Sequence, residues 1–271
     1  MKSKDKVVLV TGAGAGMGRQ VALELLRRGA KVAAIDIKKE ALEETENLAS
    51  SYSANIASFV IDISKQSEVA ALPEKVIAKF GQVDGLINVA GIIHKFKGVA
   101  ELSYEDFQRI FGVNFYGTVH MVKEFLPLLI KRPEAQILNV SSMGGYVPVP
   151  GQTVYGASKA AIKLFTEGLR SELKGTNVGV ALLFPGAVNT NISINSGALT
   201  ATEAEKMAAA APKNMKSTDQ VVAGKLIVDA FEKNSFHAFV GSDAKMMDRL
   251  SRISPERAAN LIQKKMASLI K

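Results

Sequence analysis

The sequence of 271 residues predicts an α/β fold with a doubly wound, mostly parallel sheet of seven strands. Short apolar runs alternate along the chain with segments of helical pattern, which is typical of parallel sheets covered by helices. The first run, residues 7–10, is apolar at every position, as a strand buried on both faces requires. Because no linker, repeat or low-complexity segment interrupts residues 1–271, we expect a single domain.

The predicted strands are apolar runs that are followed within two residues by Gly, Asp, Ser or Pro. They cover residues 7–10, 32–35, 56–61, 83–89, 137–140, 178–184 and 236–240. The predicted helices cover residues 21–26, 38–50, 68–80, 103–131, a segment that starts near residue 152, and 218–233. Ser103 as N-cap, with Glu105 and Asp106 in the first turn, marks the start of the longest one. An amphipathic helix is expected in the tail, residues 254–271.

Composition excludes several classes of protein. With 47% hydrophobic and 22% charged residues, the chain can bury a full core and is not disordered. It has no Cys, and the three His show no ligand spacing, so no metal site is expected. A net charge of +8 is weak evidence for nucleic acid, and no nucleic-acid partner is expected. The apolar run near the N-terminus is too short for a secretory signal, and no stretch reaches membrane-spanning length. We therefore expect a cytoplasmic protein.

Chemically useful residues follow the predicted strands where each one ends. In parallel sheets a ligand lies outside the carboxyl ends of the strands. The residues at these ends are Gly12, Asp36, Asp62, Ala90, Ser142 and Pro185. Their convergence predicts one ligand crevice.

The first strand leads into a glycine-rich loop, in which Gly12, Gly16 and Gly18 follow the pattern G-x-x-x-G-x-G. Glycines there allow a pyrophosphate to approach the N-terminus of the following helix, although they also suit a plain tight turn. Asp36 lies about 20 residues further on, where a carboxylate can accept hydrogen bonds from ribose hydroxyls. The alternative for Asp36 is a helix N-cap.

A second cluster combines Ser142 with Tyr155 and Lys159, which are four residues apart and share a helix face. A cation close to a phenol favours the phenolate and lowers its pKa toward the range of acid-base catalysis. The alternative is an ordinary exposed Tyr/Lys pair.

These motifs together resemble the short-chain dehydrogenase/reductase family, which has a Rossmann-type fold. TGAGAGMG at 11–18 is similar to the family's cofactor glycine motif, and NVAG at 88–91 to its NNAG motif, with Val89 in place of the second Asn. The family's active-site Asn, Ser, Tyr and Lys are matched by Asn114, Ser142, Tyr155 and Lys159. Pro185 and Gly186, followed by Val188 and Thr190, resemble the segment that binds the nicotinamide carboxamide.

The resemblance implies an oxidoreductase that transfers a hydride between a nicotinamide cofactor and an alcohol or carbonyl substrate. Tyr155 would be the acid-base group and Ser142 would orient the substrate oxygen. Lys159 would bind the nicotinamide ribose and lower the Tyr155 pKa, and Asn114 would hold a water that links Lys159 to a proton relay. Cofactor contacts are expected from Gly12, Gly16, Met17, Gly18, Asp36, Asp62, Ile63, Asn88, Ala90, Gly91, Tyr155, Lys159, Pro185, Gly186, Val188 and Thr190.

The expected cofactor is NAD. Relatives that use NADP often carry a basic residue before the second glycine or after the second strand, where this chain has Ala15 and Ile37. A carboxylate at Asp36 would repel the additional phosphate of NADP. Lys38 and Lys39 favour NADP instead, because either side chain could reach that phosphate.

The resemblance also implies a homodimer or homotetramer, with the helix at 103–131 at an interface. Family members carry substrate specificity in a lid, here about 191–216. The substrate pocket is expected to be mainly apolar, and His94, Lys95 and Lys97 could bind an anionic end of the substrate. A steroid, a hydroxyacyl group, a sugar and a small ketone all remain possible substrates. The tail is expected to dock on the body or on another subunit, and membrane contact is the less favoured alternative. Two further alternatives are a cofactor-binding sensor without catalysis and a membrane-associated protein of the same fold.

Overall fold

The computed structural model describes residues 1–210 and 217–266, and its centre is a single seven-stranded sheet. The strand order is β3-β2-β1-β4-β5-β6-β7, and every neighbouring pair is parallel. The doubly wound parallel sheet is therefore confirmed. The strands are β1 Val7–Thr11, β2 Lys31–Asp36, β3 Ile56–Val60, β4 Gly85–Asn88, β5 Ala135–Val140, β6 Val178–Pro185 and β7 Ala238–Val240.

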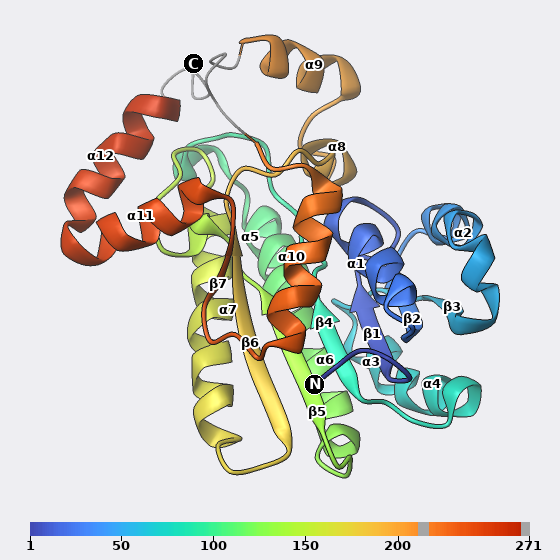
Figure 1. The fold of residues 1–271 in the computed structure, drawn as a ribbon. Coiled ribbons are helices and arrows are strands. Elements are labelled where there is room, and N and C mark those ends of the chain that lie inside the picture. Colours follow the sequence, from blue (N-terminus) through green and yellow to red (C-terminus); the bar gives the residue numbers. More distant parts are fainter. Residues whose placement is uncertain (211–216, 267–271) are drawn as a thin grey trace.

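Helices cover both faces of the sheet (Figure 1). They are α1 Gly16–Arg27, α2 Lys39–Leu48, α3 Gln66–Ala70, α4 Leu72–Phe80, α5 Tyr104–Phe111, α6 Gly117–Leu129, α7 Thr153–Glu172, α8 Ile192–Asn195, α9 Ala201–Ala210, α10 Gln220–Glu232, α11 Ser242–Ile253 and α12 Pro255–Met266. Shorter turns are η1 Ser50–Asn55, η2 Val99–Glu101, η3 Gly112–Tyr116 and η4 Met143–Gly145.

Two hydrophobic cores lie on opposite sides of the sheet. Because successive strand residues point to opposite faces, Val8 and Val10 pack with α1 and α10, whereas Leu9 packs with α4, α6 and α7. This arrangement explains why the first strand is apolar at every position. In a sheet packed in this way, a ligand is expected outside the carboxyl ends of the strands.

Two predicted helices are interrupted in the structure, and α8, α9 and α11 were not predicted. The predicted helix at 68–80 is two helices, α3 and α4, because Pro73 lies in the first turn of α4 and starts a new helix there. The predicted helix at 103–131 is interrupted by η3, a π-helix, between α5 and α6. Helix α11 was not predicted at all, because its charged sequence buries little more than Ala244 and Met247.

The C-terminal helices α11 and α12 form an arm at one side of the molecule (Figure 1). They pack on the loop after β5 through a small separate core of Val147, Met247, Ala258 and Ile262. The Tyr146 hydroxyl also donates a hydrogen bond to the Ala244 carbonyl, at 2.7 Å. The predicted tail helix is therefore α12 as far as Met266, and the rest of the tail lies outside the described residues.

In the predicted lid at 191–216, the structure has α8 and α9, and residues 211–216 lie outside the described ranges. None of the helices within those ranges is long and apolar enough to cross a membrane.

Candidate active site

The ends of β1 and β4 are joined at the centre of the sheet. The Thr11 hydroxyl accepts hydrogen bonds from the amides of Val89 and Ala90, both at 3.1 Å. Gly12 follows with φ of +70°, and a Cβ there would lie 3.0 Å from the Ala90 Cα. The predicted residues Gly12 and Ala90 therefore lie in contact, and Gly12 is required by both conformation and space.

The glycine loop leads into the N-terminus of α1. Gly16 has φ of +52°, and a Cβ at Gly18 would lie 2.1 Å from the Gly12 carbonyl oxygen. No side chain caps α1 at Ala15, so the amides of its first turn remain available to an anion. A Cβ at Gly16 would lie 3.7 Å from the Thr190 side chain, so the loop faces the segment after β6.

Asp36 is held by backbone amides at the end of β2. Its Oδ2 accepts a hydrogen bond from the Gly14 amide and its Oδ1 accepts one from the Lys38 amide, each at 3.0 Å. The N-cap of α2 is Lys38, so the alternative role of Asp36 as the cap of α2 is wrong. The carboxylate is partly exposed beside the glycine loop, where a ribose would lie.

Arg19 stabilises the same loop and was missed in the sequence. Its guanidinium donates to the Gly14 carbonyl and pairs with Glu44 of α2. A basic residue directly after a glycine motif can equally well be solvent-exposed, so the sequence does not show that Arg19 stabilises the loop.

Asn114 lies in the π-helix η3 and is fully buried. Its Oδ1 accepts a hydrogen bond from the Ile92 amide at 2.8 Å. Its Nδ2 donates to the Ile92 carbonyl at 3.0 Å and to the Ser158 hydroxyl at 2.9 Å. A π-turn inside a helix often marks a functional position, because the wider turn displaces side chains and backbone groups.

Lys159 reaches the same place from α7. A Cβ at Gly91 would lie 3.1 Å from the Lys159 Nζ and 3.4 Å from the Asn114 Oδ1. The Nζ donates a hydrogen bond to the Val140 carbonyl at 3.0 Å, and burial lowers the Lys159 pKa to about 8. The predicted pair is therefore not an exposed Tyr/Lys pair, because its lysine is only 4% exposed.

Tyr155 and Ser142 lie together beside the η4 turn. A Cβ at Gly144 would lie 3.5 Å from both the Ser142 Oγ and the Tyr155 ring. Burial raises the pKa of the Tyr155 phenol, and a hydrogen bond with Ser142 opposes that rise. A lowering of the Tyr155 pKa by Lys159 was expected, but burial raises the pKa of this phenol above its ordinary value.

Several predicted cofactor residues hold the frame around the crevice. The Asn88 side chain donates to Asn139 of β5 at 2.9 Å and is 3% exposed, so it joins strands. Asp62 accepts hydrogen bonds from the amide and hydroxyl of Ser64, and Ile63 lies under Gly117 of α6. Met17 packs on the core between α1 and α10.

The segment after β6 is held by Asp243 of α11, which the sequence did not reveal. A Cβ at Gly186 would lie 2.2 Å from the Asp243 carboxylate, and that carboxylate accepts a hydrogen bond from the Ala187 amide at 2.8 Å. Val188 forms a bridge with Thr218. The predicted residues Pro185, Gly186, Val188 and Thr190 therefore lie at and after the carboxyl end of β6, on the other side of β1 and β4 from Asp36.

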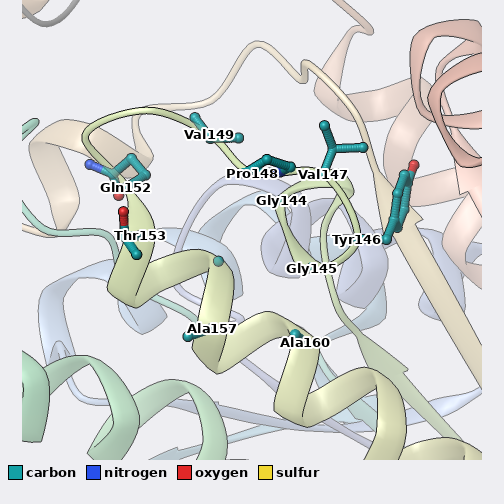
Figure 2. Close-up of a pocket in the computed structure, with 11 residues that line it drawn as sticks. Gly144, Gly145, Tyr146, Val147, Pro148, Val149, Gln152, Thr153, Ala157 and Ala160 are labelled. Atoms are coloured by element: carbon teal, nitrogen blue, oxygen red, sulfur yellow. The ribbon is translucent and has the colours of Figure 1, made fainter. Parts of the chain in front are cut away.

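A pocket of about 310 Å³ lies beside the catalytic candidates, between the loop after β5 and α7 (Figure 2). Gln152, Thr153 and Ala157 line it on the helix side, and Tyr146, Val147 and Val149 on the loop side. Tyr155 and Lys159 lie on the neighbouring face of α7. Thr153 and Ala157 are exposed, so the pocket opens on the outer surface of this helix.

Comparison with known proteins identifies the family. A family model described as short chain dehydrogenase matches residues 6–201. The chain belongs to the short-chain dehydrogenase/reductase family. The Mycobacterium tuberculosis protein SadH, named as an oxidoreductase, is 34% identical over 252 residues, which cover 92% of this chain and 91% of that protein.

Solved structures of this family share the fold. A short-chain dehydrogenase/reductase from Burkholderia phymatum in complex with NAD has a TM-score of 0.85 and 27% identity, and the match covers 95% of this chain and 96% of the other. A short-chain dehydrogenase from Burkholderia cenocepacia in complex with NADP has a TM-score of 0.76 and 27% identity, and covers both chains fully, at 100%. These relatives support a nicotinamide cofactor without distinguishing NAD from NADP.

Proposed function

We propose that this chain transfers a hydride between NAD and an alcohol or carbonyl substrate, with Asn114, Ser142, Tyr155 and Lys159 at the reacting centre. One observation carries the proposal. Asn114 of η3 and Lys159 of α7 meet at Gly91, Ser142 and Tyr155 meet at Gly144, and Tyr155 and Lys159 share α7. The helix N-terminus of the glycine turn is uncapped. The four-residue Tyr-Lys spacing and the buried lysine are hard to explain as packing alone, because a buried ammonium is costly.

The residues around the crevice fit a dinucleotide. The uncapped amides of α1 suit a pyrophosphate, and the Asp36 carboxylate suits the hydroxyls of the adenosine ribose. The cofactor, when bound, supplies or accepts the hydride. Lys159 would hold the nicotinamide ribose, and Val188 and Thr190 would bind the carboxamide.

The protein's own part of the reaction is proton transfer. Because burial raises its pKa, the Tyr155 phenol keeps its proton at neutral pH and can donate it to a carbonyl oxygen. Ser142 would hold that oxygen beside the phenol. Asn114 and Lys159 lie side by side, and they would lead the replacement proton to Tyr155 through a water held at Asn114.

The preference for NAD rests on Asp36. Its two backbone hydrogen bonds fix a negative charge where NADP carries its additional phosphate. Lys39 pairs with Glu43 of its own helix, which weakens the case that it serves a phosphate. One related structure is in complex with NAD and another with NADP, so the preference is inferred from the residues of this chain alone.

The assembly and organisation follow the family. We propose one catalytic domain over residues 1–271, with a lid at about 191–216 over a small-molecule alcohol or ketone, and a homodimer or homotetramer. Exposed apolar side chains on α5, η3 and α7 support an interface there: Tyr104, Tyr116 and Leu164 are 85%, 53% and 70% exposed.

The test of the proposed chemistry is Tyr155→Phe, assayed by NADH absorbance across a panel of alcohols and ketones. Loss of the hydroxyl should remove more than about 99% of turnover, because proton transfer is lost while the ring still packs. NADH affinity should stay within about threefold. If the variant keeps a tenth of wild-type turnover, the role of Tyr155 is wrong. A wild type that binds NADH but turns over no substrate would instead indicate a sensor.

A further inference from the structure

Two buried polar side chains beside the site have no part in the mechanism above. His94 is fully buried and Gln152 is 3% exposed. They form a pair, because the Gln152 Nε2 donates a hydrogen bond to the His94 carbonyl at 2.6 Å. Within the described ranges, the His94 Nε2 and the Gln152 Oε1 are buried atoms that find no hydrogen-bond partner. Buried polar atoms of this kind usually have a partner, so a pair of them calls for an explanation.

Hydrogen-bond chemistry decides what these two atoms can bind. The His94 Nδ1 lies 2.7 Å from the Lys95 carbonyl, and a carbonyl oxygen only accepts. In the neutral ring, Nδ1 therefore carries the proton and Nε2 is an acceptor. The Gln152 amide nitrogen is bonded to the His94 carbonyl, so the free atom of this side chain is an oxygen, also an acceptor. Two acceptors cannot satisfy each other, and both need a donor.

The segment that leads to His94 is bonded both to a catalytic candidate and to the predicted lid. Ile92, two residues before His94, is bonded through its amide and its carbonyl to Asn114. The next amide, of Ile93, donates to the Ser196 hydroxyl at the end of α8, at 3.1 Å. Gln152 comes directly before α7 and three residues before Tyr155. A substrate held at Tyr155 under the lid would therefore lie close to the two segments that carry these acceptors.

We propose that His94 and Gln152 recognise a second polar group of the substrate, a hydroxyl or an N–H that donates to these acceptors. This inference rests on the proposed function and narrows its substrate class. It favours hydroxy ketones, polyols and amides over plain alkyl ketones and alcohols. A substrate without the donor leaves two buried acceptors unpaired, which a site of this kind discriminates against strongly.

Matched substrate pairs test the inference: acetoin against butanone, and adipoin against cyclohexanone, each with NADH. In the wild type, kcat/KM should be at least about tenfold higher for the hydroxylated member. Gln152→Leu and His94→Phe should bring this ratio close to one, because kcat/KM falls selectively for the hydroxylated member. A purely structural role would lower both members of a pair equally.

Gln136→Leu is the matched control. Gln136 is also buried, at 2% exposure, but it lies in β5 and bonds to Asn234 at the opposite end of the sheet. This variant should leave the ratio unchanged. A wild-type ratio near one, or a ratio that Gln152→Leu and His94→Phe do not alter, would overturn the inference.

A binding measurement separates this inference from the proposed function. With NADH present, acetoin and adipoin should raise the melting temperature of the wild type more than butanone and cyclohexanone do, and Gln152→Leu should abolish the difference. Selective binding without turnover would refute the proposed chemistry and support the inference. Equal shifts from both members of each pair would refute the inference whether or not the protein turns over.

Discussion

At the scale of single residues, Asp36 shows how a charge is positioned before a ligand arrives. Both of its carboxylate oxygens accept backbone amide hydrogen bonds, from Gly14 and Lys38, so the side chain cannot swing away from an incoming phosphate. A Cβ at Gly14 would lie 2.9 Å from this carboxylate, so the glycine allows the close approach. The charge of Asp36 and its orientation together should select the cofactor.

We expect NADH to bind about 5- to 30-fold more tightly than NADPH, because one like-charge contact at the surface is worth about 1–2 kcal/mol. Asp36→Ala should reduce this ratio to near one, as calorimetry can measure. Glu40→Ala, which removes an exposed carboxylate from the first turn of α2, is the control and should keep the wild-type ratio. Tighter binding of NADPH to the wild type would contradict the role of Asp36.

Lys159 makes a prediction about pH. Its pKa is about 8 in the folded protein, whereas the pKa of an exposed lysine is 10.5. The unfolded chain therefore binds more protons between these values, so the stability of the cofactor-free protein should rise with pH across that window. Below about pH 8, Lys159 is charged in both the folded and the unfolded protein, and burial of this charge destabilises the folded state.

Lys159→Met keeps the apolar stem and removes this cost. At pH 7 its melting temperature should exceed that of the wild type by about 5 °C, for a free-energy difference of about 2–3 kcal/mol. Its stability should also lose the rise between about pH 8 and pH 10.5. Lys174→Met, at an exposed position after α7, is the control and should retain the wild-type profile. A variant less stable than the wild type at pH 7 would argue against a destabilising ammonium.

At the scale of elements, the arm of α11 and α12 supports the loop that follows Ser142. Its contact is a small core around Val147 and Ile262, separate from the two cores of the sheet. Asp243 at the start of α11 also holds the segment after β6. The arm therefore contacts both the loop after β5 and the segment after β6, although it is remote from the catalytic candidates in sequence.

Ile262→Ala should loosen this arm, because it leaves a cavity that costs about 2–3 kcal/mol. Hydrogen exchange of residues 143–149 should become at least about tenfold faster, and KM should rise more than kcat falls. Ile253→Ala is the control, since Ile253 is 85% exposed at the end of α11 and should have almost no effect. Unchanged exchange in the loop would show that the arm does not brace it.

At the scale of the whole molecule, the sheet positions the predicted ligand crevice, and we propose the outer face of α7 as a subunit interface. The strand order reverses between β1 and β4, which places the crevice at the centre of the carboxyl edge. The opposite surface of α7 presents Thr153, Ala157 and Leu164, and the pocket of Figure 2 opens there. Small side chains at helical spacing allow another helix to pack closely on this face.

We expect light scattering to show a homodimer or homotetramer at micromolar concentration. Leu164→Arg should yield a smaller species with unchanged circular dichroism, because a buried unpaired charge at an interface costs several kcal/mol. Leu48→Arg is the control, since Leu48 is 58% exposed at the end of α2, and it should leave the assembly intact. A monomeric wild type would rule out this interface.

Much of the fold follows from local pattern. Apolar runs and turn residues predicted all seven strands. The signal is clearest for a strand such as β1, because burial of every residue leaves a continuous apolar signature. The glycine loop and the spacing from Ser142 through Tyr155 to Lys159 could also be predicted from local pattern. The spacing of residues along the chain determines which groups share a turn or a helix face.

The tertiary structure alone decided properties that depend on distant contacts. It turned the Asn88 side chain toward Asn139, joined Lys159 to the Val140 carbonyl, and buried His94 against Gln152. It also raised the Tyr155 pKa where the sequence predicted a lowering. Desolvation depends on every group that surrounds a side chain, whereas sequence spacing identifies only its neighbours along the chain. The sequence thus determined which groups meet at the strand ends, and the packing of remote segments determined their hydrogen bonds and their protonation.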